Sequence, residues 1–116
     1  MSHKNILVDK SFQFSLQIFD LYEALLEKKH FDLARQVFKS GTSIGANIRE
    51  SQRGVSKKDF INKLGISLKE ADETQYWFDL INIKVFKIDD KLMTELDEII
   101  RLLVSIIKTS KSNLNS

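Results

Sequence analysis

The chain has 116 residues, a mass of 13.4 kDa and a formal charge of +2, with 42% hydrophobic and 29% charged residues. This composition fits one folded domain and excludes a largely disordered chain. The lack of cysteine excludes disulfides, thiolate metal sites and cysteine nucleophiles, and the lack of proline favours long helices. Only His3 and His30 carry an imidazole. We therefore expect no metal, no cofactor and no enzymatic activity.

No apolar stretch approaches the roughly 20 residues that span a bilayer. Residues 1–10 also lack the apolar segment of a signal peptide. We expect a cytoplasmic protein without membrane contact.

The spacing of apolar residues predicts four helices, of which the first covers residues 9–29. Its inner stripe is Phe14, Ile18, Leu21, Tyr22 and Leu25. A second apolar set, Phe12, Leu16, Phe19 and Leu26, lies well over 100° around the same helix. A helix that is apolar around most of its circumference needs cover on two sides. One side faces the core of the bundle, and the other predicts a subunit contact.

The second helix is predicted over residues 31–53, with Gly54 as its C-cap. Ser56 is the predicted N-cap of the third helix, which runs to residue 84, and Asp59 completes a variant of the capping box. The fourth helix begins at Asp89 or Asp90 and ends near residue 109. The inner stripe of the second helix, at steps of three and four, is Leu33, Val37, Ser40, Ile44, Ile48 and Ser51. That of the third is Phe60, Leu64, Leu68, Ala71 and Phe78, and that of the fourth is Leu92, Leu96, Ile99, Leu103 and Ile106.

The connections between the predicted helices are short, which favours antiparallel neighbours. The predicted fold is all-α, an antiparallel up-down four-helix bundle over residues 9–109 that assembles into a homo-oligomeric ring. We expect residues 1–8 to be flexible and the Ser/Asn-rich tail, residues 110–116, to be disordered.

Charge is unevenly distributed along the chain. Residues 28–69 hold ten Lys and Arg against three Asp and Glu, a local charge of +7. Residues 70–98 hold nine acidic residues against three Lys, a local charge of −6.

The positive charge is also ordered in space. A basic track, here Arg35, Lys39, Arg49, Arg53, Lys57 and Lys58, follows one face of the second predicted helix and continues past the next turn. Such a row of cations could neutralise successive phosphates. Aromatic residues do not alternate with these cations in the manner of a single-strand stacking platform, so structured RNA or a duplex fits better than a single strand. A solvated face paired with acidic neighbours is the alternative.

The segment from Ser40 to Asn47 is rich in Gly, Ser and Thr, which are mediocre to poor helix formers. Such residues are tolerated where two backbones approach closely or where a helix bends. We expect a hydrogen-bond network across the bundle that fixes the helix register. Its predicted members are Ser43, Asn47, Glu50, Glu70, Glu73 and Thr74. A phosphate-binding loop and a carboxylate metal site are disfavoured, because the P-loop Lys-Ser/Thr and the Glu-x-x-His pairs are absent.

Trp77 departs from the inner stripe of its helix and shares a separate stripe with Ile66. A lone tryptophan on a secondary apolar face indicates contact with another chain, although a satellite core position is the alternative. The predicted subunit interface consists of Phe12, Leu16, Phe19, Ile66 and Trp77.

The run Ser40-Gly41-Thr42-Ser43-Ile44-Gly45-Ala46-Asn47-Ile48-Arg49-Glu50-Ser51, then Asp59-Phe60-Ile61 and Leu68-Lys69-Glu70-Ala71-Asp72-Glu73-Thr74, resembles bacterial four-helix-bundle proteins called intervening-sequence proteins. The name refers to inserts within large-subunit ribosomal RNA genes that encode some of them. The resemblance implies a four-helix subunit, a homopentamer in relatives, and no established catalytic activity. Retroelement accessory proteins of similar fold bind a reverse transcriptase and nucleic acid, which raises the expectation of an RNA- or DNA-associated role.

Two functions remain open at this stage. The first is a homo-oligomeric bundle that binds structured nucleic acid, most plausibly RNA, through the basic track. The second is a protein-interaction scaffold in which the basic track meets an acidic protein or the acidic half of a neighbouring subunit.

Overall fold

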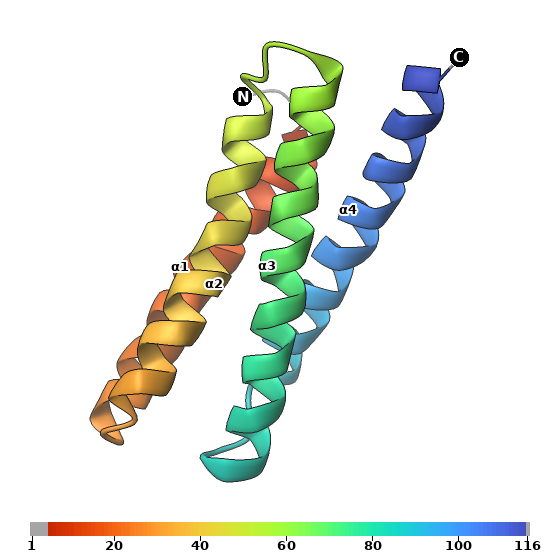
Figure 1. The fold of residues 1–116 in the computed structure, drawn as a ribbon. Helices are drawn as coiled ribbons and strands as arrows, with labels where there is room; N and C mark the ends of the chain where they lie inside the picture. Colours follow the sequence, from red (N-terminus) through yellow and green to blue (C-terminus); the bar gives the residue numbers. More distant parts are fainter. Residues whose placement is uncertain (1–4, 116) are drawn as a thin grey trace.

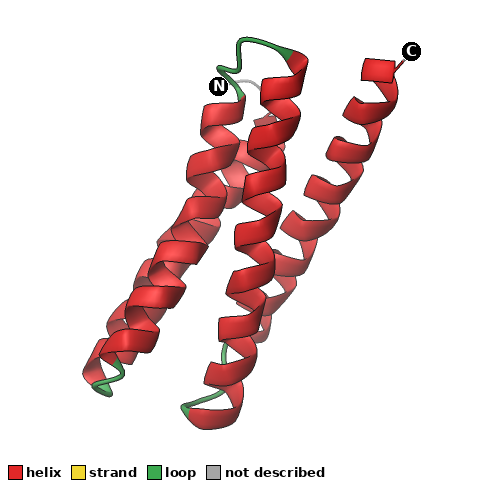
Figure 2. Ribbon diagram, in the orientation of Figure 1, coloured by secondary structure: helices red, strands yellow, loops and turns green. Residues whose placement is uncertain are grey.

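A computed structural model describes residues 5–115 of the chain. Within these residues it contains four helices and no strand: α1 (Ile6–Glu27), α2 (Phe31–Ser51), α3 (Lys57–Lys84) and α4 (Asp90–Asn115) (Figure 2). The predicted all-α class with four helices is confirmed.

Figure 1 shows the four helices side by side along the long axis of a particle that measures 50 × 26 × 22 Å. The α2–α3 connection lies at the same end as both termini, and the other two connections lie at the opposite end. Helix α2 packs against α1 and α3, whereas α4 packs mainly against α3 and has its sparsest contacts with α1. Helices α1 and α2 therefore pack tightly against each other along a seam. The edge of this seam that faces away from α3 and α4 is open to solvent.

Side-chain and backbone hydrogen bonds define the helix ends. Ser56 Oγ accepts a hydrogen bond from the Asp59 amide at 3.1 Å, and the Asp59 carboxylate accepts one from the Val55 amide at 3.4 Å. The predicted N-cap of α3 is confirmed. Helix α2 ends at Ser51 and no glycine in the described residues has a positive φ, so the prediction of Gly54 as a C-cap is wrong.

The C-terminus of α1 closes without a glycine. Lys29 has a φ of 63°. Its amide donates to the Leu26 carbonyl at 2.9 Å, and the His30 amide donates to the Leu25 carbonyl at 3.0 Å. This is the Schellman pattern, which satisfies carbonyls at the helix end at the expense of placing a lysine in the left-handed region.

Two terminal predictions are corrected. Helix α1 begins at Ile6 because Leu7 is buried and extends the inner stripe, so residues 6–8 are helical where flexibility was predicted. Helix α4 continues to Asn115, beyond the predicted end near residue 109, and neither proline nor glycine interrupts residues 110–115. The predictions for residues 1–4 and 116 lie outside the described residues.

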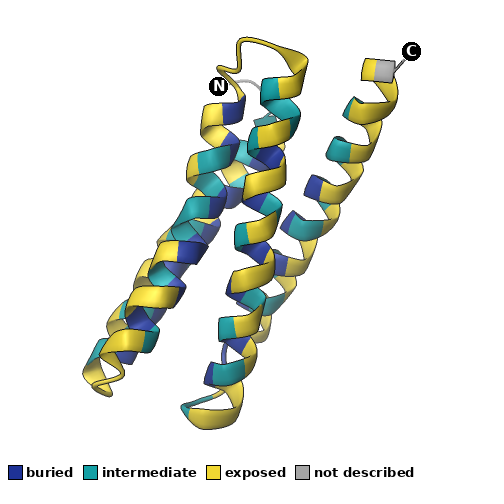
Figure 3. Cartoon of the chain, in the orientation of Figure 1, coloured by how far each residue is buried: buried dark blue, intermediate teal, exposed yellow. Residues whose placement is uncertain are grey.

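Most residues of the predicted stripes are buried in the core, and Figure 3 shows the buried faces of the helices turned toward one another. The exceptions are only partly buried and pack against the core: Tyr22, Leu33, Phe60, Leu68 and Ile106. Phe14 of α1 and Phe78 of α3 are fully buried, with ring centroids 6.2 Å apart. The largest other fully buried side chains are Ile18, Leu25, Ile44, Ile48, Leu64, Ile81, Leu96, Ile99 and Leu103. All four helices thus contribute to one hydrophobic core.

The glycine-rich segment serves the close approach of α1 and α2. A Cβ atom on Gly41 would lie 2.8 Å from both Cδ1 and Cγ1 of Ile18, and Ile18 is fully buried. A Cβ atom on Gly45 would lie 3.3 Å from the backbone oxygen of Ser11. Close approach, one of the two explanations that the sequence offered, therefore accounts for both glycines.

The predicted polar network across the bundle is wrong in most of its members. Ser43 donates to the Lys39 carbonyl and Asn47 to the Ser43 carbonyl, both within α2. Short polar side chains in a helix often bond to the preceding turn of their own backbone, and these two do so here.

A smaller set of hydroxyls connects α2 to α3. Thr74 Oγ1 lies 2.8 Å from Ser40 Oγ and 2.8 Å from the Glu70 carbonyl oxygen. Ser67 Oγ donates to the Ile44 carbonyl at 2.8 Å. Of the predicted network, only Thr74 makes a buried cross-helix contact through its side chain, and its partner is Ser40 of α2.

Alanine substitutions at Gly41 and Gly65 form a matched test of the close approach. G41A gains helix propensity but places a methyl group against immobile Ile18, so we expect a net loss of about 1 kcal/mol or more in the free energy of unfolding. G65A meets nothing within 4 Å and should gain about 1 kcal/mol. Urea denaturation measures both values. Equal shifts of the two variants in one direction would contradict the packing role of Gly41.

Candidate nucleic-acid interface

The structure places the basic track on two neighbouring elements. Arg35, Lys39 and Arg49 are exposed on α2, and Arg53 is exposed in the connection that follows. Lys57 and Lys58 are exposed in the first turn of α3. The structure gathers Arg49 and Arg53 at one groove, but Lys58 lines a different groove between α3 and α4.

Most cations of the basic track have no acidic partner in the described part of the chain. Only Arg35 forms an ion pair, with Asp32 one turn earlier on α2. The other five, Lys39, Arg49, Arg53, Lys57 and Lys58, have no carboxylate within 4.0 Å among residues 5–115. The alternative of a face neutralised by acidic neighbours therefore holds for Arg35 alone.

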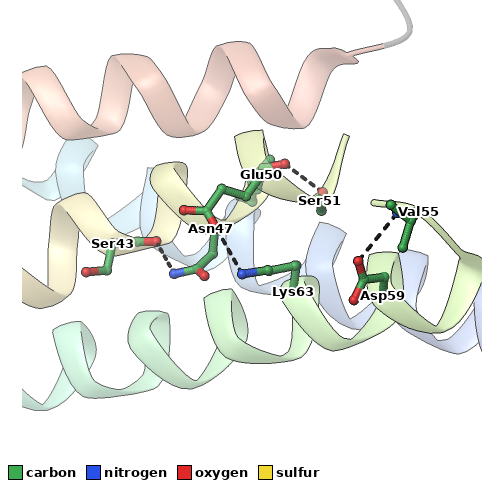
Figure 4. A network of polar contacts seen from close by, with 8 residues as sticks. Ser43, Asn47, Glu50, Ser51, Val55, Asp59 and Lys63 are labelled. Atoms are coloured by element: carbon green, nitrogen blue, oxygen red, sulfur yellow. Dashed lines mark hydrogen bonds and ion pairs between the residues drawn. The ribbon is translucent and has the colours of Figure 1, made fainter. Parts of the chain in front are cut away.

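Glu50, a predicted member of the polar network, forms an ion pair instead. Its carboxylate accepts a hydrogen bond from Lys63 Nζ of α3 at 2.8 Å (Figure 4). The hydrogen bond and the negative charge of Glu50 raise the pKa of the Lys63 ammonium above its usual value. The negative charge nearest to Arg49 and Arg53 along α2 is thus already balanced by a lysine.

Phe12 of α1 adds an aromatic ring to the basic track. The Arg49 guanidinium carbon lies 5.7 Å from the centre of the Phe12 ring, which is within the range of a cation–π contact. The prediction that these cations lack the aromatic partners of a stacking platform is therefore wrong at Arg49, where Phe12 lies beside the guanidinium. Sequence reasoning assigned Phe12 to the subunit interface and missed its position beside the basic track.

A groove with a volume of about 640 Å³ follows the outer edge of the α1–α2 seam. Its walls include Phe12, Ser15, Gly45, Ala46, Arg49 and Arg53. We call this the α1–α2 groove. It exists because small residues occupy both helices where they approach most closely, while larger side chains stand at its edges.

The predicted subunit interface is partly exposed. About half of each side chain of Phe12, Leu16 and Phe19 is accessible, and 38% of Ile66. Phe19 has an intramolecular partner, because its ring centre lies 5.1 Å from that of Phe38 on α2. Trp77 is only half-buried and packs against the core, and its indole N–H donates to Glu73 at 3.2 Å.

The described residues form neither a metal site nor a membrane-spanning helix. Among residues 5–115, no group of three or more His, Cys, Asp or Glu side chains could hold a metal ion. None of the helices in this range is both long and apolar enough to cross a membrane.

The comparisons with known proteins agree with the resemblance noted in the sequence. A solved structure from Bacteroides thetaiotaomicron VPI-5482, described as a protein with unknown function from the S23 ribosomal protein family, is similar to this chain at 45% identity and a TM-score of 0.84. The similarity covers 90% of this chain and 96% of that one. No curated protein matches the chain. The family model of the 23S rRNA-intervening sequence protein matches residues 3–105, and the chain therefore belongs to this family.

Proposed function

We propose that this chain is a cytoplasmic, non-enzymatic up-down bundle that assembles into a homo-oligomeric ring and binds structured RNA through the basic track. The observation that carries the proposal is a set of exposed cations, among them Arg49 and Arg53, that have no carboxylate partner among residues 5–115. A cation without a counter-ion on its own chain is available to a phosphate.

The contacts proposed for the basic track carry charge but little sequence information. Arg49 lies in the last turn of α2 and Arg53 two residues beyond its end, and Arg35 and Lys39 extend the row along α2. Arginine is always protonated near neutral pH and can bond a phosphate through two N–H groups. Phosphate binding of this kind positions an RNA stem and weakens steeply with added salt. The chain belongs to a family that is named after inserts in ribosomal RNA genes. This favours RNA over DNA as the polymer to test first.

Charge reversal within the basic track tests this function. The double variant R49E/R53E should bind a fully paired RNA hairpin more weakly, because two phosphate contacts become repulsive. The slope of log K against log salt should fall in magnitude by about two. Fluorescence anisotropy titrations at several salt concentrations measure both quantities.

The matched control reverses two exposed lysines away from the basic track, Lys84 and Lys108. The double variant K84E/K108E has the same net charge as R49E/R53E and should retain the affinity and the salt slope. Equal losses in the two variants, or no binding by the unmodified protein at low salt, would refute the proposed function.

The second candidate function is a protein-interaction scaffold built by head-to-tail contacts between copies. The observation that favours it is the pair of half-exposed apolar side chains Leu16 and Ile66 on α1 and α3, together with the +7 and −6 halves of the chain. When one surface of each copy binds a different surface of the next copy, the contacts run head to tail. Such contacts form a ring if the rotation between neighbouring copies closes on itself. The family resemblance implies five subunits.

Light scattering tests the assembly. We expect a mass well above 13.4 kDa at physiological salt and a smaller mass at about 1 M salt, where charge contacts are screened. L16D should lower the mass, because it places a carboxylate in an apolar contact. The control V55D alters an exposed apolar side chain in the α2–α3 connection and should leave the mass unchanged. A particle of 13.4 kDa would refute the assembly, and a mass that salt does not change would refute its electrostatic part.

A further inference from the structure

The volume of the α1–α2 groove is in the range of a small-molecule site. Its volume of about 640 Å³ lies within the range of roughly 300 to 1,000 Å³ that small-molecule pockets occupy. The groove is open because Gly45 and Ala46 present almost no side chain to it. The close approach of the two helices requires glycine at positions 41 and 45. It does not require a small side chain at position 46, because Ala46 is exposed.

The Phe12 ring provides an apolar face at the edge of this groove. The core does not use this ring, because 48% of the side chain is accessible. The carbon of the Arg49 guanidinium lies 5.7 Å from the ring centre. An aromatic ring next to cations is the combination on which nucleic-acid bases stack while their phosphates are neutralised. An exposed cation–π contact is weak, so Arg49 can leave the ring for a phosphate when a base takes its place.

The polar groups of the walls are hydrogen-bond acceptors. Ser15 Oγ donates its proton to the Ser11 carbonyl at 3.0 Å, and Thr42 Oγ1 donates to the Phe38 carbonyl at 2.7 Å. Each hydroxyl has a single proton, so the oxygens that line the groove are left to accept. An exocyclic amino group, such as that of adenine, is a suitable donor for them.

We propose that the α1–α2 groove binds one unpaired nucleotide of a structured RNA, with its base stacked on Phe12 and its phosphate bound by Arg49 and Arg53. This inference rests on the proposed function, because the basic track holds the adjacent stem. Glu50 also lines the groove, but its carboxylate is bound to Lys63 and does not repel the phosphate as a free charge would. Recognition of unpaired bases in bulges and loops is the usual way in which proteins read RNA.

The experiment compares two RNA hairpins of identical stem, one fully paired and one with a single unpaired adenosine in the stem. The unmodified protein should bind the bulged hairpin about tenfold more tightly at the same salt concentration. F12A removes the ring and A46Q fills the groove, so each variant should lose this preference. Both should keep the affinity for the paired hairpin, since the cations remain.

The matched control is I6A, which truncates a similarly exposed apolar side chain on α1 that neither lines the groove nor belongs to the predicted subunit interface. I6A should keep the tenfold preference. Circular dichroism and light scattering should show that F12A and A46Q retain the helical content and the mass of the unmodified protein.

Several results would overturn this inference without touching the proposed function. Equal binding of the two hairpins by the unmodified protein is one, and loss of the preference in I6A is another. A changed mass for F12A would assign Phe12 to a subunit contact instead. Adenosine monophosphate is the probe for a free nucleotide, and if it competes as strongly as the bulged hairpin, the groove is not an RNA subsite. If neither hairpin binds, the proposed function itself fails.

Discussion

The close approach of α1 and α2 is the constraint on which the rest of this surface depends. Gly41 leaves room for the fully buried side chain of Ile18, so the helix backbones come together where a methyl group would keep them apart. Because the backbones are close, side chains at the outer edges of the two helices also meet. Phe12 and Arg49 are such a pair, and their contact brings an aromatic ring from α1 to cations from α2. A glycine in the core thus determines the chemistry of the exposed groove.

The sequence predicts the helices and the core well, because one physical requirement governs both. Apolar residues at steps of three and four can be buried only on one face of a helix, and Phe14, Ile44 and Leu96 are indeed buried. Ser56 marks the start of α3 because its hydroxyl accepts a hydrogen bond from a free amide of the first turn. Both signals are local, so no knowledge of the other helices is needed to use them.

The candidate site is harder to predict, because its features depend on the rotation of one helix against another. The pattern places Phe12 on a secondary apolar face of α1, but only packing decides that this face meets Arg49. The prediction of a polar network across the bundle is wrong for a related reason. Ser43 and Asn47 lie on the expected side of α2, yet each bonds to the backbone of its own helix, and Glu50 is bound to Lys63. Periodicity gives the direction of a side chain from its helix but not the partner that it finds there.

The second apolar face of α1 illustrates how packing alters the argument for assembly. The prediction that a second subunit covers the outer apolar face of α1 assumes that α2 contacts only the inner stripe of α1. In the structure α2 also reaches the second face, since Phe19 contacts Phe38 and Phe12 contacts Arg49. Cover from α2 is partial, as about half of each ring is still accessible, so the pressure to bury this face is reduced but not removed. A ring that is held at one side and open at the other has lost part of its conformational freedom before any ligand arrives, and such preorganisation lowers the entropic cost of stacking.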